Sequence, residues 1–332
     1  MKFETLKEKL KKQSNDYSSV EKDFLNLTGE KLVNTINFTK QSQIKLKSLS
    51  IIIPYFNSSQ SIFHTLNSIQ KQQNIDFEDI EIIIIDDGSE KELKIKQKYS
   101  FRIKILRLCE NKGRVRVRNI GLLLANYDVI MFLDADIILH ENVLYNHLLV
   151  HSVLRKDNLL LVGFREWIKK EDKRIIKKNL RLNDIDLTFD HRIKITFGKR
   201  HLPFINNKKL LGKTIYIAKD TDYYKNLGNY KSYFDFKLYQ QVHGFLFSIP
   251  LEEALKAGPA GETSKGWGSD DIMLTTKFIA LGAKVIPLLN SMALHLHDIN
   301  EIVKKDQKIE ERKTNLKRFE QQLEEPFIEF VK

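Results

Sequence analysis

Cysteine is almost absent from this 332-residue chain, because Cys109 is the only one. A single thiol excludes an intramolecular disulfide, a cysteine-rich zinc site and a CxxC redox pair, and we expect Cys109 to be a small buried apolar residue. Long apolar runs are also missing, since the longest lie at Ile51–Ile53, Ile82–Ile85 and Leu159–Val162. A membrane-spanning helix needs roughly 20 such residues. The opening MKFETLKEKLKK has no apolar core and predicts no secretory signal peptide. We therefore expect a cytoplasmic location, either free or peripheral at the inner membrane face.

Basic residues outnumber acidic ones, with 55 Lys and Arg against 43 Asp and Glu, which gives a formal net charge of +12. Such a balance suits a polyanion, an anionic membrane surface or a phosphorylated substrate. The charge is spread along the chain rather than gathered in a stripe, and no signature of a nucleic-acid-binding module appears. We therefore expect no nucleic-acid partner, although a non-catalytic protein that binds anions or nucleic acid stays an alternative.

Both ends of the chain have helical patterns. Residues 1–48 predict one or two amphipathic helices, which we interpret as a cap on the main domain rather than a membrane or partner helix. In the tail, residues 301–332, apolar positions recur every seven residues and are joined by Phe319: Ile302, Ile309, Leu316 and Leu323. This repeat fits a coiled-coil seam that would form a homodimer, but a helix packed on its own domain is the favoured interpretation.

Between the two ends, residues 49–155 alternate apolar runs with helical patterns. Continuous apolar runs predict strands that are buried on both faces, as in parallel sheets. These runs are Leu49–Ile53, Ile80–Ile85, Ile103–Leu108 and Asp128–Leu133, with helices at Ser61–Gln70, around Ile120–Leu124 and from Glu141 to Leu154. The connections are too long for hairpins, so the pattern predicts an α/β fold with a doubly wound, mostly parallel sheet and flanking helices.

The rest of the main domain, which we place at residues 49–300, is less regular. Residues 156–240 include a basic and aromatic stretch from 165, which we interpret as an inserted region. This region suits either acceptor recognition or a local aromatic core under a basic surface. Residues 241–300 return to compact structure, with a helix after Ser269 and a strand at Ala283–Pro287.

Acidic clusters follow two of the predicted strands, at Asp86-Asp87 and at Asp134-Ala135-Asp136. Ligands of open parallel sheets bind beyond the carboxyl ends of the strands, so these carboxylates should share one edge. Like charges gathered there are unfavourable unless a cation, a partner or solvent relieves them, and hard oxygen ligands suit Mg²⁺ or Mn²⁺. Taken alone, each cluster also fits a plain turn and helix N-cap.

Five segments in order resemble the nucleotide-sugar-binding half of family-two glycosyltransferases of the GT-A fold. They are Ser50–Asn57 (SIIIPYFN), Ile85–Ser89 (IDDGS), Asn111–Gly113 (NKG), Arg118–Gly121 (RNIG) and Phe132–Asp136 (FLDAD). The match covers about residues 49–155. The resemblance implies that Pro54 and Phe56 line a uridine site, that Asp87 accepts from the uracil N3–H, and that Arg118 helps to close the nucleotide pocket.

The resemblance also implies a metal site. Asp136 would bind the metal that bridges the diphosphate, and Asp134 would contact the ribose or metal-bound water. A histidine near the sequence Ala-Leu-His-Leu-His-Asp completes the metal shell in related sequences. His295 fits that place better, but His295 and His297 would face the same side of an extended segment, so both stay candidates.

A segment in the second half, Gly266-Trp267-Gly268-Ser269-Asp270-Asp271 after Val242–Phe245, resembles the acceptor-side Gly-Trp-Gly-Gly-Glu-Asp of galactosyl- and N-acetylgalactosaminyltransferases. The resemblance implies acceptor contacts for Trp267 and Asp270 and a catalytic base at Asp271. Asp270 stands where those enzymes have Glu. Both carboxylates are also expected to open a helix, where the macrodipole favours them.

Together these patterns predict a metal-dependent inverting glycosyltransferase that uses Mn²⁺ or Mg²⁺. Its donor would be a UDP-sugar, and its acceptor a glycan, a lipid-linked sugar or a peptide. Asp271 would deprotonate the acceptor nucleophile. A nucleotidyltransferase would also use paired carboxylates and a metal, and it stays the alternative enzyme, although it gives no reason for the Gly-Trp-Gly-x-Asp-Asp segment.

Overall fold

A computed structural model of the chain describes residues 4–330 apart from 33–36, 59, 156, 170, 178, 187–241, 262–267, 269 and 298–304. Most of the predicted insertion, and Trp267, therefore lie outside the described residues. The described strands form one sheet in the order β3-β2-β1-β4-β7-β6-β8-β5. Their bounds are β1 Leu49–Tyr55, β2 Ile80–Asp86, β3 Arg102–Arg107, β4 Val129–Leu133, β5 Ile137–Leu139, β6 Leu159–Lys169, β7 Leu246–Pro250 and β8 Lys284–His297.

The first half of the sheet is parallel, as the apolar runs predict. β1 pairs in parallel with β2 on one side and β4 on the other, and β3 extends the sheet beyond β2. β2 and β4 are buried along their whole length because helices cover both of their faces, which explains the apolar runs Ile82–Ile85 and Val129–Leu133. β3 is the edge strand, and most of its side chains are exposed.

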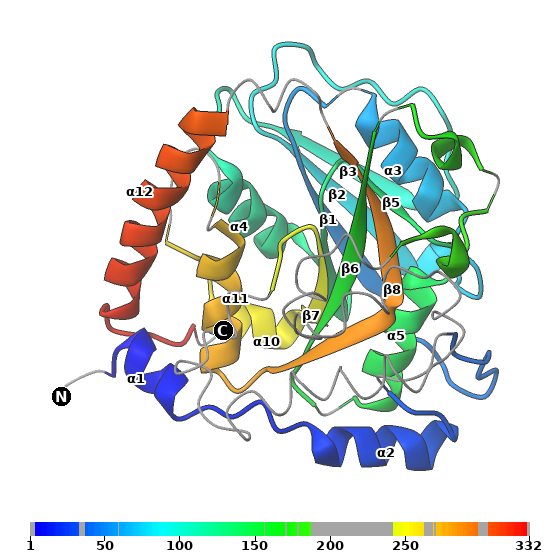
Figure 1. Cartoon of the computed structure of the whole chain (residues 1–332), viewed down its shortest axis with the longest axis horizontal. Helices are drawn as coiled ribbons and strands as arrows, with labels where there is room; N and C mark the ends of the chain where they lie inside the picture. The colour runs from blue at the N-terminus through cyan, green and yellow to red at the C-terminus, as the bar shows by residue number, and fades with distance from the viewer. Residues whose placement is uncertain are drawn as a thin grey trace.

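The second half of the sheet is mixed. β7 runs antiparallel to both of its neighbours, β4 and β6. β6 and β8 are parallel, and β5, at the end of the sheet, runs antiparallel to β8. The sequence pattern predicted neither β5 nor β7, and it ended the last strand at Pro287, whereas β8 continues to His297. In Figure 1 the long strands β6 and β8 cross the middle of the molecule.

Helices cover the two faces of the sheet (Figure 1). Their bounds are α1 Leu6–Lys11, α2 Ser18–Thr28, α3 Ser61–Gln70, α4 Arg114–Leu124, α5 Val143–Val153, α10 Leu251–Ala257, α11 Asp270–Ala280 and α12 Lys305–Leu323. One face packs against α3 and α5, and the other against α4, α10 and α11. The predicted α/β class, with a mostly parallel sheet and flanking helices, is confirmed.

The contact between α4 and β1 requires a glycine. A Cβ atom on Gly121 would lie 2.3 Å from Cγ2 of Ile52, well inside van der Waals contact. Gly121 therefore lets α4 lie close on the sheet, which sets the height of its first turn above the strand ends.

The terminal segments pack on the main domain, as the favoured interpretation expected. The backbone of Leu6 donates to Glu325 at 3.1 Å, and that of Phe327 donates to Glu4 at 2.8 Å, so the two ends of the chain bind each other. On α12, Phe319 and Leu323 are buried in the same apolar cluster as Leu6. The remaining described positions of the seven-residue repeat, Ile309 and Leu316, are exposed.

The structure bears on the exposure of Cys109 and on the apolar character of the helices. Cys109 is exposed, so the prediction of a buried thiol was wrong: it follows the edge strand β3, where no further strand covers the chain. Within the described ranges, none of the helices combines the length and the apolar character that crossing a bilayer requires.

Candidate active site

The carboxyl ends of the parallel strands place the predicted acidic residues at one edge of the sheet. β1 lies between β2 and β4, so Asp86-Asp87 and Asp134–Asp136 follow strands on either side of it. The backbone N–H of Asp87 donates to Tyr55 at 2.8 Å, and that of Asp134 donates to Phe245 at 3.1 Å. The turn at Asp134 is thereby tied to the segment that leads into β7.

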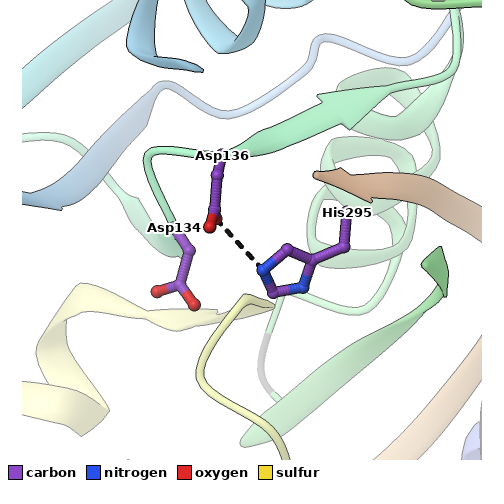
Figure 2. A group of neighbouring side chains, drawn as sticks. All are labelled: Asp134, Asp136 and His295. Atoms are coloured by element: carbon purple, nitrogen blue, oxygen red, sulfur yellow. Dashed lines mark ion pairs between the residues drawn. The ribbon is translucent and has the colours of Figure 1, made fainter. Parts of the chain in front are cut away.

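Asp134, Asp136 and His295 form a group that could hold a metal ion. One ligand atom from each lies within 4.8 Å of the others, and Figure 2 shows the three side chains around one space. Asp136 Oδ1 is 3.2 Å from Nε2 of His295. The antiparallel pairing of β5 with β8 explains this proximity, because it sets Ile137 opposite His295. The side chain of His297 lies outside the described part of the chain.

The donor set fits a divalent cation. Two carboxylates and one imidazole suit Mn²⁺ or Mg²⁺. Apart from this contact with His295, Oδ1 of Asp136 is buried and makes no hydrogen bond among the described residues, which is costly unless a ligand satisfies it. Burial alone would raise the pKa of Asp136, but His295 and the charge of Arg114 outweigh it and lower that pKa. Asp136 is therefore ionised at neutral pH, as a metal ligand must be.

Residues of β6 hold the ring of His295. Nη1 of Arg165 lies 2.9 Å from Nδ1, and the ring of Trp167 stacks on the imidazole at 3.9 Å between centroids. Arginine can only donate, so Nδ1 accepts and a neutral His295 carries its proton on Nε2, facing Asp136. A cation at Nε2 would require the proton to be on Nδ1 instead, and Arg165 to turn away from that nitrogen. Sequence patterns missed Arg165; its position two residues before Trp167, on the same face of β6, becomes informative only once β6 is known to extend past Val162.

Arg118 connects the two halves of the main domain. It lies on α4 with only 2% of its surface exposed, and its Nη1 donates to the carboxylate of Asp270. Its Nη2 donates to Oδ1 of Asp134 at 3.2 Å and to the carbonyl of Gly244 at 3.3 Å. Asp270 and Asp271 begin α11, as predicted.

Asp271 lies on the other side of Gly244. Its Oδ2 accepts from the backbone N–H of Gly244 at 2.9 Å, and its Oδ1 accepts from that of Ile272 at 2.9 Å. Burial and the neighbouring charge of Asp270 raise the pKa of Asp271, against the opposing charge of Arg118. A carboxylate with a raised pKa is a better proton acceptor once ionised.

Arg114, the first residue of α4, is exposed. Desolvation lowers its pKa, but four carboxylates outweigh that effect and raise the pKa. They are Asp270, Asp134, Asp136 and Asp271.

The residues predicted for the base of the nucleotide lie at the ends of β1 and β2. Oδ1 and Oδ2 of Asp87 accept from the backbone N–H groups of Lys112 and Gly113 at 2.6 and 3.0 Å. Burial raises the pKa of Asp87. These bonds attach the segment before α4 to the end of β2. Phe56 is 46% exposed and Pro54 is partly exposed, so both rings are accessible.

Comparison with known proteins identifies relatives. The family described as glycosyl transferase family 2 matches residues 50–225, which is more than half of the chain. The poly(ribitol-phosphate) beta-N-acetylglucosaminyltransferase TarP of Staphylococcus aureus is 35% identical over 109 residues, covering 31% of this chain and 33% of TarP. The chondroitin synthase of Pasteurella multocida is 34% identical over 125 residues, covering 36% of this chain and 12% of the synthase. The matched segments thus span a third of these relatives or less.

Solved structures are similar to the chain at lower identity. The structure of S. aureus TarS 1–349 in complex with UDP-GlcNAc superposes with a TM-score of 0.47 at 15% identity, covering 76% of this chain and 59% of TarS 1–349. A mannosyltransferase of Pyrobaculum calidifontis in complex with GDP-Man and Mn²⁺ has a TM-score of 0.49 at 13% identity, covering 82% and 65% of the two chains.

Proposed function

Because the chain belongs to glycosyl transferase family 2, we propose that it moves a sugar from a UDP-sugar to a glycan, lipid-linked or peptide acceptor, with inversion at the anomeric carbon. The observation that carries the proposal is the joining of two groups: the Asp134, Asp136 and His295 cluster, and Asp271 beside Gly244. A metal site next to a carboxylate with a raised pKa provides both a place for a diphosphate and a base for an acceptor hydroxyl.

The donor end of the reaction uses the strand ends. Phe56 and Pro54 offer accessible rings to the uracil. Asp87 is 4% exposed and already binds the backbone N–H groups of Lys112 and Gly113, so it would accept from the uracil N3–H with a remaining lone pair of its carboxylate. Asp134, Asp136 and His295 would hold Mn²⁺ or Mg²⁺, which when bound supplies positive charge against the diphosphate of the leaving UDP.

The acceptor end uses Asp271. Its carboxylate takes the proton of the acceptor hydroxyl as the oxygen attacks the anomeric carbon from the face opposite UDP, which inverts that centre. General-base assistance of this kind contributes typically about 10²–10⁴-fold. The two backbone N–H groups that bind Asp271 orient it, and its raised pKa favours proton uptake. Association with the membrane surface and a homodimer through the terminal helices belong to the same proposal as untested features.

The test is a donor panel of UDP-sugars and free nucleoside triphosphates, assayed with Mn²⁺, with Mg²⁺ and with chelator. We expect UDP release from one UDP-sugar, stimulated by acceptor and metal. Asp136→Asn should abolish transfer and weaken metal-dependent UDP binding in calorimetry. Asp271→Asn should abolish transfer and leave UDP binding intact.

A matched control is Asp79→Asn, because Asp79 is an exposed acid at the opposite end of β2. It should behave as the unmodified chain. Pyrophosphate release from a nucleoside triphosphate without turnover of any UDP-sugar would instead identify a nucleotidyltransferase, and full transfer by Asp271→Asn would remove the proposed base.

A further inference from the structure

Asp270 begins a helix but does not face solvent. An acidic residue in the first turn of a helix is usually exposed and interacts with the helix N-terminus. Asp270 is only 6% exposed, and its carboxylate meets Nη1 of Arg118, which is 152 positions away in the sequence. A side chain that holds an acceptor sugar has to present its oxygen atoms to the substrate. The carboxylate of Asp270 is instead directed at a buried cation.

Arg118 has partners from three separate segments. They are Asp270 on α11, Asp134 after β4, and the carbonyl of Gly244 before β7. A buried guanidinium is strongly unfavourable unless charged partners surround it, so removing one of them leaves the others with unbalanced charge. Arg118 therefore depends on both halves of the main domain being in place.

Gly244 connects Arg118 to Asp271 through its backbone. The carbonyl of Gly244 accepts from Arg118, while its N–H donates to Oδ2 of Asp271. A Cβ atom on Gly244 would lie 2.5 Å from Nη2 of Arg118 and 2.8 Å from Cβ of Asp271. Arg118 and Asp271 therefore both lie close against Gly244, and the backbone of Gly244 is bonded to both.

We propose that Arg118 and Asp270 are positioning residues, a buried charge pair that holds Asp271 at a set place relative to Asp134. The inference rests on the proposed function, in which Asp271 is the base and Asp134 belongs to the metal group. Asp270 then does not bind the acceptor sugar, and Arg118 does not touch the nucleotide.

The first experiment separates positioning from acceptor binding by steady-state kinetics of Asp270→Asn, which keeps the size of the side chain. Loss of the pair lets the base move, and a misplacement of about 1 Å can cost roughly 10²-fold in rate. We expect kcat to fall by about that factor while the KM for acceptor changes less than twofold. A rise of tenfold or more in acceptor KM with kcat retained would show that Asp270 binds the acceptor, and would overturn the proposal.

The second readout is the acid limb of the kcat profile. The charge of Asp270 raises the pKa of Asp271 and the charge of Arg118 lowers it. Asp270→Asn should therefore move the acid limb to lower pH, and Arg118→Met should move it to higher pH. A purely structural pair far from the base would leave the acid limb of each variant at the pH of the unmodified chain. An unmoved acid limb in both variants therefore contradicts the positioning role.

The third measurement does not depend on activity. Urea unfolding of Arg118→Met, Asp270→Asn and the double variant forms a double-mutant cycle. Each single change leaves a buried charge unpaired, so the double variant should lose less stability than the sum of the singles. Arg118→Met combined with Asp79→Asn is the control and should be additive. Additivity in the Arg118 and Asp270 cycle overturns the pairing. If no UDP-sugar is turned over by the unmodified chain, the proposed function fails, and this cycle alone still decides whether the two residues are coupled.

Discussion

Acidification should unfold this protein through a cluster of buried histidines that takes no part in the proposed reaction. His147 and His151 on α5 and His140 just before it are each 1% exposed or less. Nδ1 and Nε2 of His147 lie 2.6 Å from the hydroxyls of Ser248 and Ser291, and Nε2 of His151 lies 2.9 Å from Ser248. Burial lowers the pKa of His140 to about 4 and that of His147 to about 3, and it lowers the pKa of His151 well below its ordinary value.

The direction in which stability changes with pH depends on whether the folded or the unfolded chain binds more protons. Below pH 6.5 the histidines of the unfolded chain take up protons, whereas the folded ones stay neutral down to their lowered pKa values, so stability is lost as pH falls. Each histidine contributes about 1.4 kcal/mol per pH unit while its folded form stays neutral, which gives roughly 5 kcal/mol for His140 and His147 between pH 6.5 and 4.5, and His151 acts in the same direction. A typical domain has a stability of about 5–15 kcal/mol. We therefore expect cooperative unfolding between about pH 4 and 5.

The assay is urea unfolding followed by circular dichroism at pH 7.5, 6.5 and 5.5. The free energy of unfolding should fall by about 4 kcal/mol per pH unit at the acid end. His147→Gln should reduce that slope by about a third, because glutamine can bond both serine hydroxyls without titrating. His64→Gln, on the partly exposed face of α3, is the matched control and should change the slope much less. A slope that His147→Gln leaves unchanged would refute the reasoning.

Three further outcomes are expected. Gly244→Ala should lower kcat by about 10²-fold, since its Cβ would collide with Arg118 and Asp271, while acceptor KM changes little. Lys277→Met should raise the thermal midpoint at pH 7 by removing a penalty of up to about 3 kcal/mol, because burial lowers the pKa of Lys277 to about 8. In the unmodified chain this penalty is relieved as pH rises from 8 to 10.5, and the variant should lack that rise in stability. Added Mn²⁺ at a hundredfold excess over its Kd should stabilise the chain by about 2.7 kcal/mol in thermal shift, and Asp136→Asn should abolish the effect.

The parallel half of the sheet could be predicted because its strands are buried on both faces. Ile82–Ile85 has no polar interruption, so the run itself reveals the strand. β8 was cut short for the opposite reason. Its middle carries Asn290 and Ser291, which look like the end of a strand but are buried. The hydroxyl of Ser291 bonds to His147 and the backbone carbonyl of Asn290 to His140, both far away in the sequence, and only the folded structure brings them together.

Some residues of the candidate site could likewise be predicted from local sequence patterns, and others could not. Asp134 and Asp136 follow a recognisable strand, so their place at the sheet edge was predictable from local pattern. The choice of His295 depended on the register of β5 with β8, which no local pattern contains. The pairing of Arg118 with Asp270 joins two helices across 152 positions and could be found only from coordinates. Long-range pairs of this kind escape motif reading because their residues need no common spacing.

The antiparallel strand β7 explains how the two halves come to share one site. In a purely parallel sheet, the segment entering the strand beside β4 would lie at the opposite edge from Asp134. β7 runs the other way, and its register sets Leu246 opposite Leu133, so the residues that enter β7 lie where β4 ends. Gly244 thereby comes beside Asp134 and can accept from Arg118 and donate to Asp271. A slip of one residue in this register would turn each side chain of β7 to the other face and separate the metal group from the base. The direction of one strand, rather than any single motif, therefore makes the combined site possible.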